Sequence, residues 1–314
     1  MAVFETYTQL RQAEDVQDEI YIISPVDNPV CSMSRTIRAR GKLHEWTEDV
    51  LAAAAANAAV EGAAAPADSS SAVVEKNNYC QIMTKRAEIS GTLEEVEKYG
   101  RDSEMAYQLE LRYGELANDE ELAVVGAPGG TRQTATAGNA STARKMASLH
   151  GQLDSSVIKF ATDTRASNGT DITTVTALED CLLDAHQATY NAGGNPSYLV
   201  TSPTSSNYIP AFAYQSGRSR DIRNERQFVN VIDLYVSNFG QLDVILDRNM
   251  DSTNECFLLL DFNYLATPVL RTTADWPLAK SGDSDSRQIL RESTFAVLNS
   301  KAHGMVDEIP SGLT

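Results

Sequence analysis

Two short stretches contain residue types that bind metals, and each lacks a ligand that its motif requires. HEWTE (44–48) resembles HExxH, in which two histidines on one helical face hold zinc. Glu48 replaces the second histidine, and the segment has the pattern of a strand. DRNMDSTNECFL, which begins at Asp247, resembles a calcium-binding loop, but it has Ser252 at the glycine turn and Leu258 at the bidentate glutamate. Neither stretch predicts a metal site.

The residues and loops of common catalytic sites are also missing. The sequence contains no GxSxG, no GxxxxGK[ST] and no GxGxxG after a strand. Its histidines are scattered, and none stands at metal-binding spacing from a cysteine: His44, His150, His186 and His303. We expect His186, within a predicted helix, to be exposed or hydrogen-bonded. No catalytic residue, cofactor or metal is therefore predicted.

Two arginine-rich stretches could contact phosphate or an acidic protein surface. RTIRARGK contributes Arg35, Arg38 and Arg40, and GRSRDIRNER contributes Arg218, Arg220, Arg223 and Arg226. In the second stretch Asp221 and Glu225 interleave with the arginines, and no aromatic residue is present to stack on bases. Ion pairing within the molecule or with a neighbouring subunit is the favoured interpretation, and phosphate contact is the alternative.

Composition restricts the classes of protein to consider. The 314 residues carry 26 Lys+Arg and 43 Asp+Glu, a net charge of −17, which repels nucleic acid at long range. The longest apolar runs, such as CFLLL, are far shorter than the roughly 20 residues of a membrane span. The N-terminus shows no secretion signal, and the cysteines have no CxxC spacing, which predicts reduced thiols in a cytoplasm: Cys31, Cys80, Cys181 and Cys256.

The stretch LAAAAANAAVEGAAAPADSSSA, from Leu51 to Ala72, has the composition of a linker. Its flanks, KLHEWTEDV and VVEKNNYCQIMTKRAEIS, both have strand character, which predicts a long hairpin. QIMTKRAEISGT mixes polar and apolar residues on both faces, so we expect a ribbon without a firm inner side. Such a hairpin is marginal alone and must lie on something else.

Helices are predicted in five places. We expect a short one over Gln12–Tyr21, followed by extended or turn geometry at Pro25 and Pro29. Capping boxes open two more, one at Thr92 and Glu95 with a stop at Gly100, and one at Thr176 and Glu179. A long helix from Ser103 to Val124 has Asp102 as the expected N-cap, and STARKMASLH predicts a helix capped near Ser141. The buried positions expected in the two longest helices are Met105, Leu109, Tyr113, Leu116 and Val124, and Leu178, Cys181, Leu182 and Ala185.

Strands are predicted mainly in the second half of the chain. SYLVTSP reads as a buried strand, and VNVIDLYVSNFGQLDVILDR as a hairpin that turns near 238–240, with Asp243 and Asp247 on a wet face. CFLLLDFNYLATPVL should continue the sheet, and RQILRESTFAVLNSKAHGMVDEI should supply the last strands. Helices and strands mix without a βαβ rhythm, which predicts an α+β protein.

The order of these features resembles the major capsid protein of tailed phages of the Hong Kong 97 type, and more narrowly its podophage branch. The stretches that carry the resemblance are DEIYIISPVDNPVCSM, LHEWTEDVLAAAAANAAVEG, NYCQIMTKRAEISGT, GRDSEMAYQLELRYGEL, NAGGNPSYLVTSP, VIDLYVSNFGQLDVILDRNM and WPLAKSGDSDSRQILRESTFAVLNSKAHG. They cover most of the chain in the expected order, although no single piece is specific by itself.

The resemblance implies an architecture of named parts. These are an N-terminal arm (1–40), an extended loop (41–90), a peripheral domain with the long spine helix (91–160), an axial domain (161–272) and a return to the peripheral domain (273–314). The loop would lie across an adjacent subunit, paired strand to strand. Trp46 and Glu61 on the loop, together with the seven arginines named above, are the candidate subunit contacts.

The resemblance also implies a mechanical function without enzyme activity. Many copies would form hexamers and pentamers of an icosahedral phage head that encloses double-stranded DNA without binding it specifically. Expected partners are other copies, portal and scaffolding proteins, and a decoration protein, with assembly in the bacterial cytoplasm. No lysine lies between Lys42 and Lys76, so no isopeptide cross-link is expected at the loop tip. An encapsulin-type compartment, another virion structural protein and a soluble enzyme are the alternatives.

Overall fold

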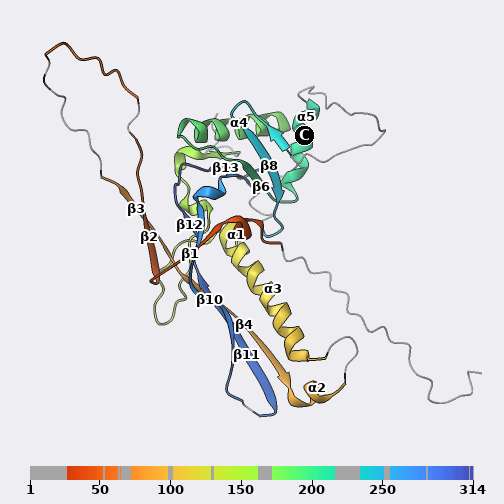
Figure 1. Cartoon of the computed structure of the whole chain (residues 1–314). Helices are drawn as coiled ribbons and strands as arrows, with labels where there is room; N and C mark the ends of the chain where they lie inside the picture. Colours follow the sequence, from red (N-terminus) through yellow and green to blue (C-terminus); the bar gives the residue numbers. More distant parts are fainter. Residues whose placement is uncertain are drawn as a thin grey trace, which may run out of the picture.

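The computed structural model describes residues 27–51, 54–62, 64, 72–97, 102–128, 131–161, 172–215, 234–250, 255–280, 282–310 and 312–313. The predicted helix over Gln12–Tyr21 and the arginines of 217–226 lie outside the described residues. Figure 1 shows three parts: a body around α4, a long arm in which α3 runs beside β4, β10 and β11, and a ribbon of β2 and β3 that projects away from both.

The long arm is built on a five-stranded sheet. β1 (Arg35–Arg38) runs parallel to β10 (Leu265–Pro277), which pairs antiparallel with β11 (Ser284–Ser293), which in turn pairs antiparallel with β4 (Gln81–Ser90). β12 (Ala296–Val297) also pairs with β10. β10 and β11 therefore connect a strand near the N-terminus with the strand that follows the ribbon.

Strand β4 has a firm buried face, so the prediction of a strand without an inner side is wrong. Met83, Ala87 and Ile89 are buried, and Met83 and Ala87 pack with Leu109 and Leu116 of α3. The alternation of polar and apolar residues did not reveal this face, because the charged Lys85 occupies an inward position of the strand. Its ammonium lies 2.6 Å from the Asp119 carboxylate of α3, so the charge is paired rather than buried alone.

The spine helix α3 (Glu104–Val125) matches the prediction within one residue at each end. Its N-cap is Ser103 rather than Asp102, because the Ser103 hydroxyl accepts the Ala106 N–H at 3.2 Å. The Glu94 carboxylate accepts the backbone N–H groups of Glu104 and Met105, which stabilises the positive end of the helix dipole. Leu109, Leu116 and Val124 are buried as predicted, whereas Tyr113 is exposed and donates to Asp275.

Two other predicted helix starts are wrong by a few residues. In α2 (Gly91–Glu95) the Ser90 hydroxyl accepts the Leu93 N–H, so the helix begins before Thr92, and it already ends at Val96. In α4 (Val175–Asn191) the Thr174 hydroxyl accepts the Ala177 N–H in place of the predicted box at Thr176. In both helices the cap is a hydroxyl two residues before the predicted one, and it accepts a backbone N–H group of the first turn.

The body packs α4 on a six-stranded sheet with the order β5-β13-β9-β6-β8-β7. The strands are β5 (Ile158–Phe160), β13 (Gly304–Asp307), β9 (Phe257–Leu260), β6 (Tyr198–Thr201), β8 (Gln241–Leu246) and β7 (Leu234–Val236). The predicted inner face of α4 is buried, and α5 (Tyr208–Gln215) packs beside it. CFLLL and the strand after it belong to different sheets, because η5 (Phe262–Tyr264) turns the chain between them. The arrangement is α+β, as predicted.

Residues 141–150 form no helix, contrary to the prediction. Lys145 pairs with Thr136 in a β-bridge, and the Asn139 side chain accepts the N–H groups of Ser141 and Thr142. The Asn78 side chain hydrogen-bonds both the N–H and the carbonyl of Ala147. Partners distant in the sequence therefore satisfy the backbone of this segment in an extended conformation. Two short 3-10 turns follow this segment, η2 (His150–Gln152) and η3 (Ser155–Val157). A third, η4 (Ser205–Asn207), comes after β6.

A short helix, α1 (Pro29–Met33), stands where turn geometry was expected. Proline fits the first helical position because its missing N–H needs no partner there. The Glu121 carboxylate of α3 accepts the next two N–H groups, those of Val30 and Cys31, each at 2.8 Å. The spine helix thus holds the start of the described chain in place.

Candidate subunit-interface site

The predicted hairpin around the alanine-rich stretch is present. β2 (Leu43–Glu48) pairs antiparallel with β3 (Val74–Tyr79), with Leu43 opposite Tyr79 and Glu48 opposite Val74. Beyond the paired strands the described residues are exposed: Leu51 is 95% exposed and Val60 81%. The ribbon therefore carries apolar side chains that no described part of its own chain covers.

Two polar side chains fix the paired strands of the ribbon to the rest of the subunit, Asn78 at the base and Glu48 at the outer end opposite Val74. Asn78 is fully buried; its amide donates to the carbonyls of Phe295 and Ala147, and its oxygen accepts the Ala147 N–H at 2.8 Å. The Glu48 carboxylate accepts the N–H and the hydroxyl of Ser300, both at 2.9 Å. Sequence reasoning missed both anchors. Asparagine in the interior of a strand was the available signal, because it is depleted there.

The ribbon has two unlike faces, because side chains alternate along each strand. One face includes Trp46 and the two anchors and turns toward the subunit. The other face, here called the acidic face, consists of exposed residues: Glu45, Thr47, Glu75 and Asn77. It carries two carboxylates and no cation.

The candidate contact residues lie in three separate places. Trp46 is half-buried on the inner face of the ribbon, its ring 5.8 Å from that of His44, and burial lowers the pKa of His44. Glu61 is exposed in a turn that Gly62 completes with a φ of +82°. Arg35, Arg38 and Arg40 lie on and just after β1, so the structure does not gather the candidates into one cluster.

Arg35, Arg38 and Arg40 form what is here called the basic strand. All three are exposed, and none forms an ion pair with another described residue. The predicted pairing within the molecule is therefore not seen in the described part of the chain. Their charge is free to act on another molecule.

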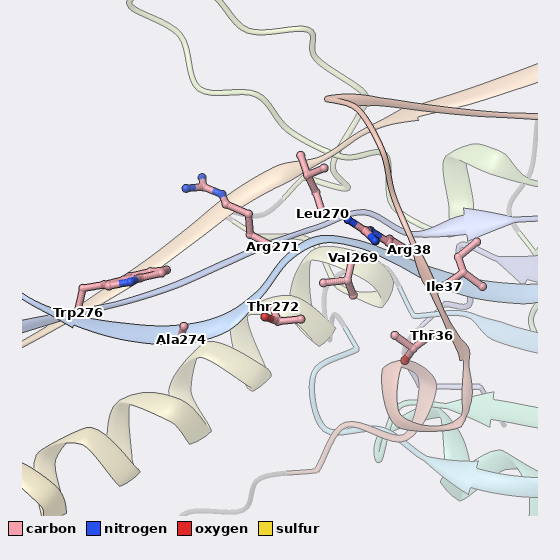
Figure 2. A pocket seen from close by; sticks show the side chains of 9 residues that line it. All are labelled: Thr36, Ile37, Arg38, Val269, Leu270, Arg271, Thr272, Ala274 and Trp276. Carbon is pink, nitrogen blue, oxygen red and sulfur yellow. The ribbon is translucent and has the colours of Figure 1, made fainter.

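A groove of about 620 Å³ opens beside the basic strand. β1 pairs with β10 only as far as Arg38 opposite Val269, and Ala39 donates one further hydrogen bond to the Val269 carbonyl. β10 continues from 270 to 277, and along this side no described strand pairs with it. Figure 2 shows the groove, with Arg38 at one end, Arg271 and Thr272 in the middle, and Trp276 at the other end.

A buried pair of carboxyl groups lies where α3, α1 and the end of β8 meet. Glu121 and Asp247 are both fully buried, and they are near enough for the charge of Glu121 to act on Asp247. Burial raises the pKa of Asp247 to about 8, and the nearby Glu121 charge adds to this; burial also raises the pKa of Glu121. The prediction that Asp247 faces water is wrong. The Asp247 side chain also accepts the Asn249 N–H, so it closes a turn rather than holding calcium.

In the described ranges no three metal-binding side chains converge, and no helix is long and apolar enough to cross a bilayer. His186 is buried and its Nδ1 pairs with the Ser237 hydroxyl, which agrees with the expectation of a hydrogen-bonded histidine.

The model of one protein family, described as SU10 major capsid protein, matches residues 2–310. The chain belongs to the SU10 major capsid protein family. A curated relative, the major capsid protein of Escherichia phage Phieco32, is 24% identical over 339 residues, covering 97% of this chain and 96% of the relative. Members of this family are structural proteins, so the chain is a phage capsid protein and not an enzyme.

Solved capsid structures share the fold of this SU10-family chain. A structure of Microbacterium phage Oxtober96 has a TM-score of 0.63 at 12% identity and covers 96% of both chains. The SrpI encapsulin of Synechococcus elongatus PCC 7942 has a TM-score of 0.61 at 9% identity, over 98% of this chain and 96% of its own. The predicted Hong Kong 97-type fold is confirmed. Phage heads and encapsulins share it, and the family match favours the phage.

Proposed function

We propose that this capsid protein closes into an icosahedral shell of hexamers and pentamers that encloses double-stranded DNA. The observation that carries the proposal is the ribbon. Asn78 and Glu48 fix its paired strands to the subunit, yet beyond them it exposes apolar side chains and has no core of its own. An isolated two-stranded hairpin is marginal in water, so the ribbon needs a surface of another molecule. In a shell of identical subunits that molecule is another copy.

The predicted division of the chain fits this role. The extended loop would cover 41–90, with β4 as the strand through which it re-enters the peripheral domain of 91–160 and 273–314. Residues 161–272 would form the axial domain, and 1–40 the arm. Trp46, Glu61 and the seven arginines remain the proposed subunit contacts.

Two features support enclosure of DNA rather than specific binding to it. The net charge of −17 opposes binding along most of the surface. Outside the basic strand, the exposed Arg86, Arg271 and Lys280 are each paired with a carboxylate. Weak contacts between subunits would add up, because each copy is held at several sites at once. Portal, scaffolding and decoration proteins, and assembly in the host cytoplasm, complete the proposal.

Expression of the chain with the head genes of its phage tests this function. Negative-stain microscopy should show closed particles of uniform diameter, and hydrogen exchange at 54–62 should be fast in free subunits and slower in particles. Only small oligomers under every assembly condition, with equal exchange in both samples, would contradict the proposal.

A further inference from the structure

We propose that a proton-controlled strap joins the long arm to the body, closed while Asp247 is protonated and open once Asp247 ionises. The strap is here residues 27–33, the segment that contains α1 and precedes β1. It acts within one subunit, so free subunits are enough to test it. The function proposed above can fail or hold independently of the strap.

The strap lies where the long arm meets the body. Figure 1 shows α1 between the upper end of α3 and the body. Glu121 of α3 accepts the N–H groups of Val30 and Cys31, each at 2.8 Å. From the body, the Asn249 amide, just after β8, donates to the Asp27 carbonyl at 2.9 Å. The long arm and the body therefore each hold one part of the strap.

The strap itself is short and weakly buried. α1 has five residues, far below the roughly 12 at which an isolated helix becomes even marginally stable. Val30 is its only buried residue and packs at the end of α3. Directly after the strap, the Ser34 hydroxyl lies 2.6 Å from that of Thr267, and β1 pairs with β10. The strap can therefore swing about Ser34 while the sheet of the long arm stays intact.

Two fully buried carboxyl groups meet at this joint, Glu121 from the long arm and Asp247 from the body. Both oxygens of Glu121 accept N–H groups of the strap, which favours its ionised form and leaves the proton to Asp247. One oxygen of Asp247 accepts the Asn249 N–H, whereas Oδ2 is buried without a hydrogen-bond partner in the described part of the chain. A second charge here would be both desolvated and repelled, so the closed joint favours a proton on Asp247.

No neighbouring cation is available to offset an ionised Asp247. The elements packed around it bring five further titratable or charged side chains: Asp27, Cys31, Glu120, Arg248 and Arg291. Arg248 lies 3.7 Å from the Asp27 carboxylate, and Arg291 of β11 lies 2.8 Å from that of Glu120. Burial raises the pKa of the Cys31 thiol, so it stays neutral. β6, whose backbone also binds Asp247, has no charged side chain.

Opening of the joint should therefore depend on pH. The pKa of Asp247 is about 8 in the closed joint and 3.8 when its carboxyl group is solvated. Opening returns the group to water and releases its proton, so the open fraction should rise about tenfold for each pH unit between these values. The joint keeps its full stability below pH 3.8, and the dependence ends above about 8.

Hydrogen exchange on purified full-length subunits at pH 5.5, 6.5 and 7.5 tests the strap. After correction for the intrinsic rate, exchange at 30–34 should rise about tenfold per pH unit in the wild type and stay constant in Asp247→Asn. Exchange at 257–260, in the middle of the body sheet, should be slower than at 30–34 at every pH. Asn249→Ala should speed exchange at 30–34 at every pH without changing its slope, and the exposed Asp243→Asn should follow the wild type.

Alkylation of Cys31, located by peptide mass, is a second readout. The ratio of the wild-type rate to that of Asp247→Asn should grow about tenfold per pH unit, because ionisation of the thiol itself cancels between the two. Corrected wild-type exchange at 30–34 that does not change with pH would overturn the strap without any variant. Equal pH dependence in Asp247→Asn would also overturn it. So would equal protection at 30–34 and 257–260, because the strap would then open only when the whole subunit unfolds.

Discussion

Replacing Asp247 with asparagine should remove a pH dependence from the stability of the fold. Asp247 and Glu121 are fully buried against each other, and the Asp247 side chain also accepts the Asn249 N–H at 2.8 Å. Asparagine has nearly the same shape, keeps an oxygen for Asn249 and supplies an N–H to Glu121 without needing a proton. The variant should therefore fold like the wild type.

The magnitude follows from the raised pKa of Asp247, about 8 against an ordinary value of 3.8. The native state keeps a proton that the unfolded chain releases, so stability is complete at pH below 3.8 and falls as pH rises toward 8. One extra proton in the native state makes the free energy of unfolding fall by about 1.4 kcal/mol for each unit of rising pH. Between pH 5.5 and 7.5 the wild type should lose roughly 2 to 3 kcal/mol relative to Asp247→Asn.

Urea unfolding at pH 5.5, 6.5 and 7.5, followed by circular dichroism, measures this difference. Histidines also titrate in this range of conditions; burial lowers the pKa of His303 to about 4, for example. Their contribution to stability cancels when the variant is compared with the wild type at each pH, because they titrate equally in both. Asp243→Asn, at an exposed position of β8, the strand that ends just before Asp247, is the matched control and should follow the wild type. Equal slopes for Asp247→Asn and the wild type would refute the raised pKa of Asp247.

Three further predictions concern the ribbon. Asn78→Ala should lower the free energy of unfolding by about 1–3 kcal/mol, because the buried Ala147 N–H loses its acceptor. The control Asn77→Ala, at an exposed position, should change it by less than about 0.5 kcal/mol, and urea unfolding measures both. Glu48→Ala should change the free energy of unfolding by no more than about 1 kcal/mol, but it should speed hydrogen exchange at 74–79, because Ser300 no longer holds the ribbon. The control Glu45→Ala should leave exchange at 74–79 unchanged, and wild-type protection in Glu48→Ala would contradict the anchoring role of Glu48. Assembled shells boiled in detergent should yield only the 34.1 kDa chain on a gel, because no lysine lies between Lys42 and Lys76; a ladder of larger bands would contradict this.

Local sequence patterns predicted the elements whose partners are near in the chain. The spine helix and the inner face of α4 followed from apolar spacing, and the hairpin β2–β3 from its two strand-like flanks. N-cap positions were missed by one or two residues, because several hydroxyl or carboxyl side chains stand close to each helix start and geometry selects among them.

Features that depend on distant partners could not be predicted. The buried face of β4 was hidden by Lys85, whose charge is paired only once α3 lies above it. Residues 141–150 have a helical pattern, but Asn78 and Thr136 claim their backbone groups. The basic strand was visible as an arginine cluster, whereas the groove along 270–277 of β10 depends on where β1 stops pairing with β10, which no local sequence pattern indicates.

A reconstruction of the assembled shell by electron cryomicroscopy tests the central claim most directly, because it traces residues 43–79 relative to neighbouring subunits. The paired strands should stay anchored to their own subunit at Asn78 and Glu48, and the loop beyond Glu48 and Val74 should lie on another copy. A ribbon folded onto its own subunit, without contact to any other copy, would contradict the account.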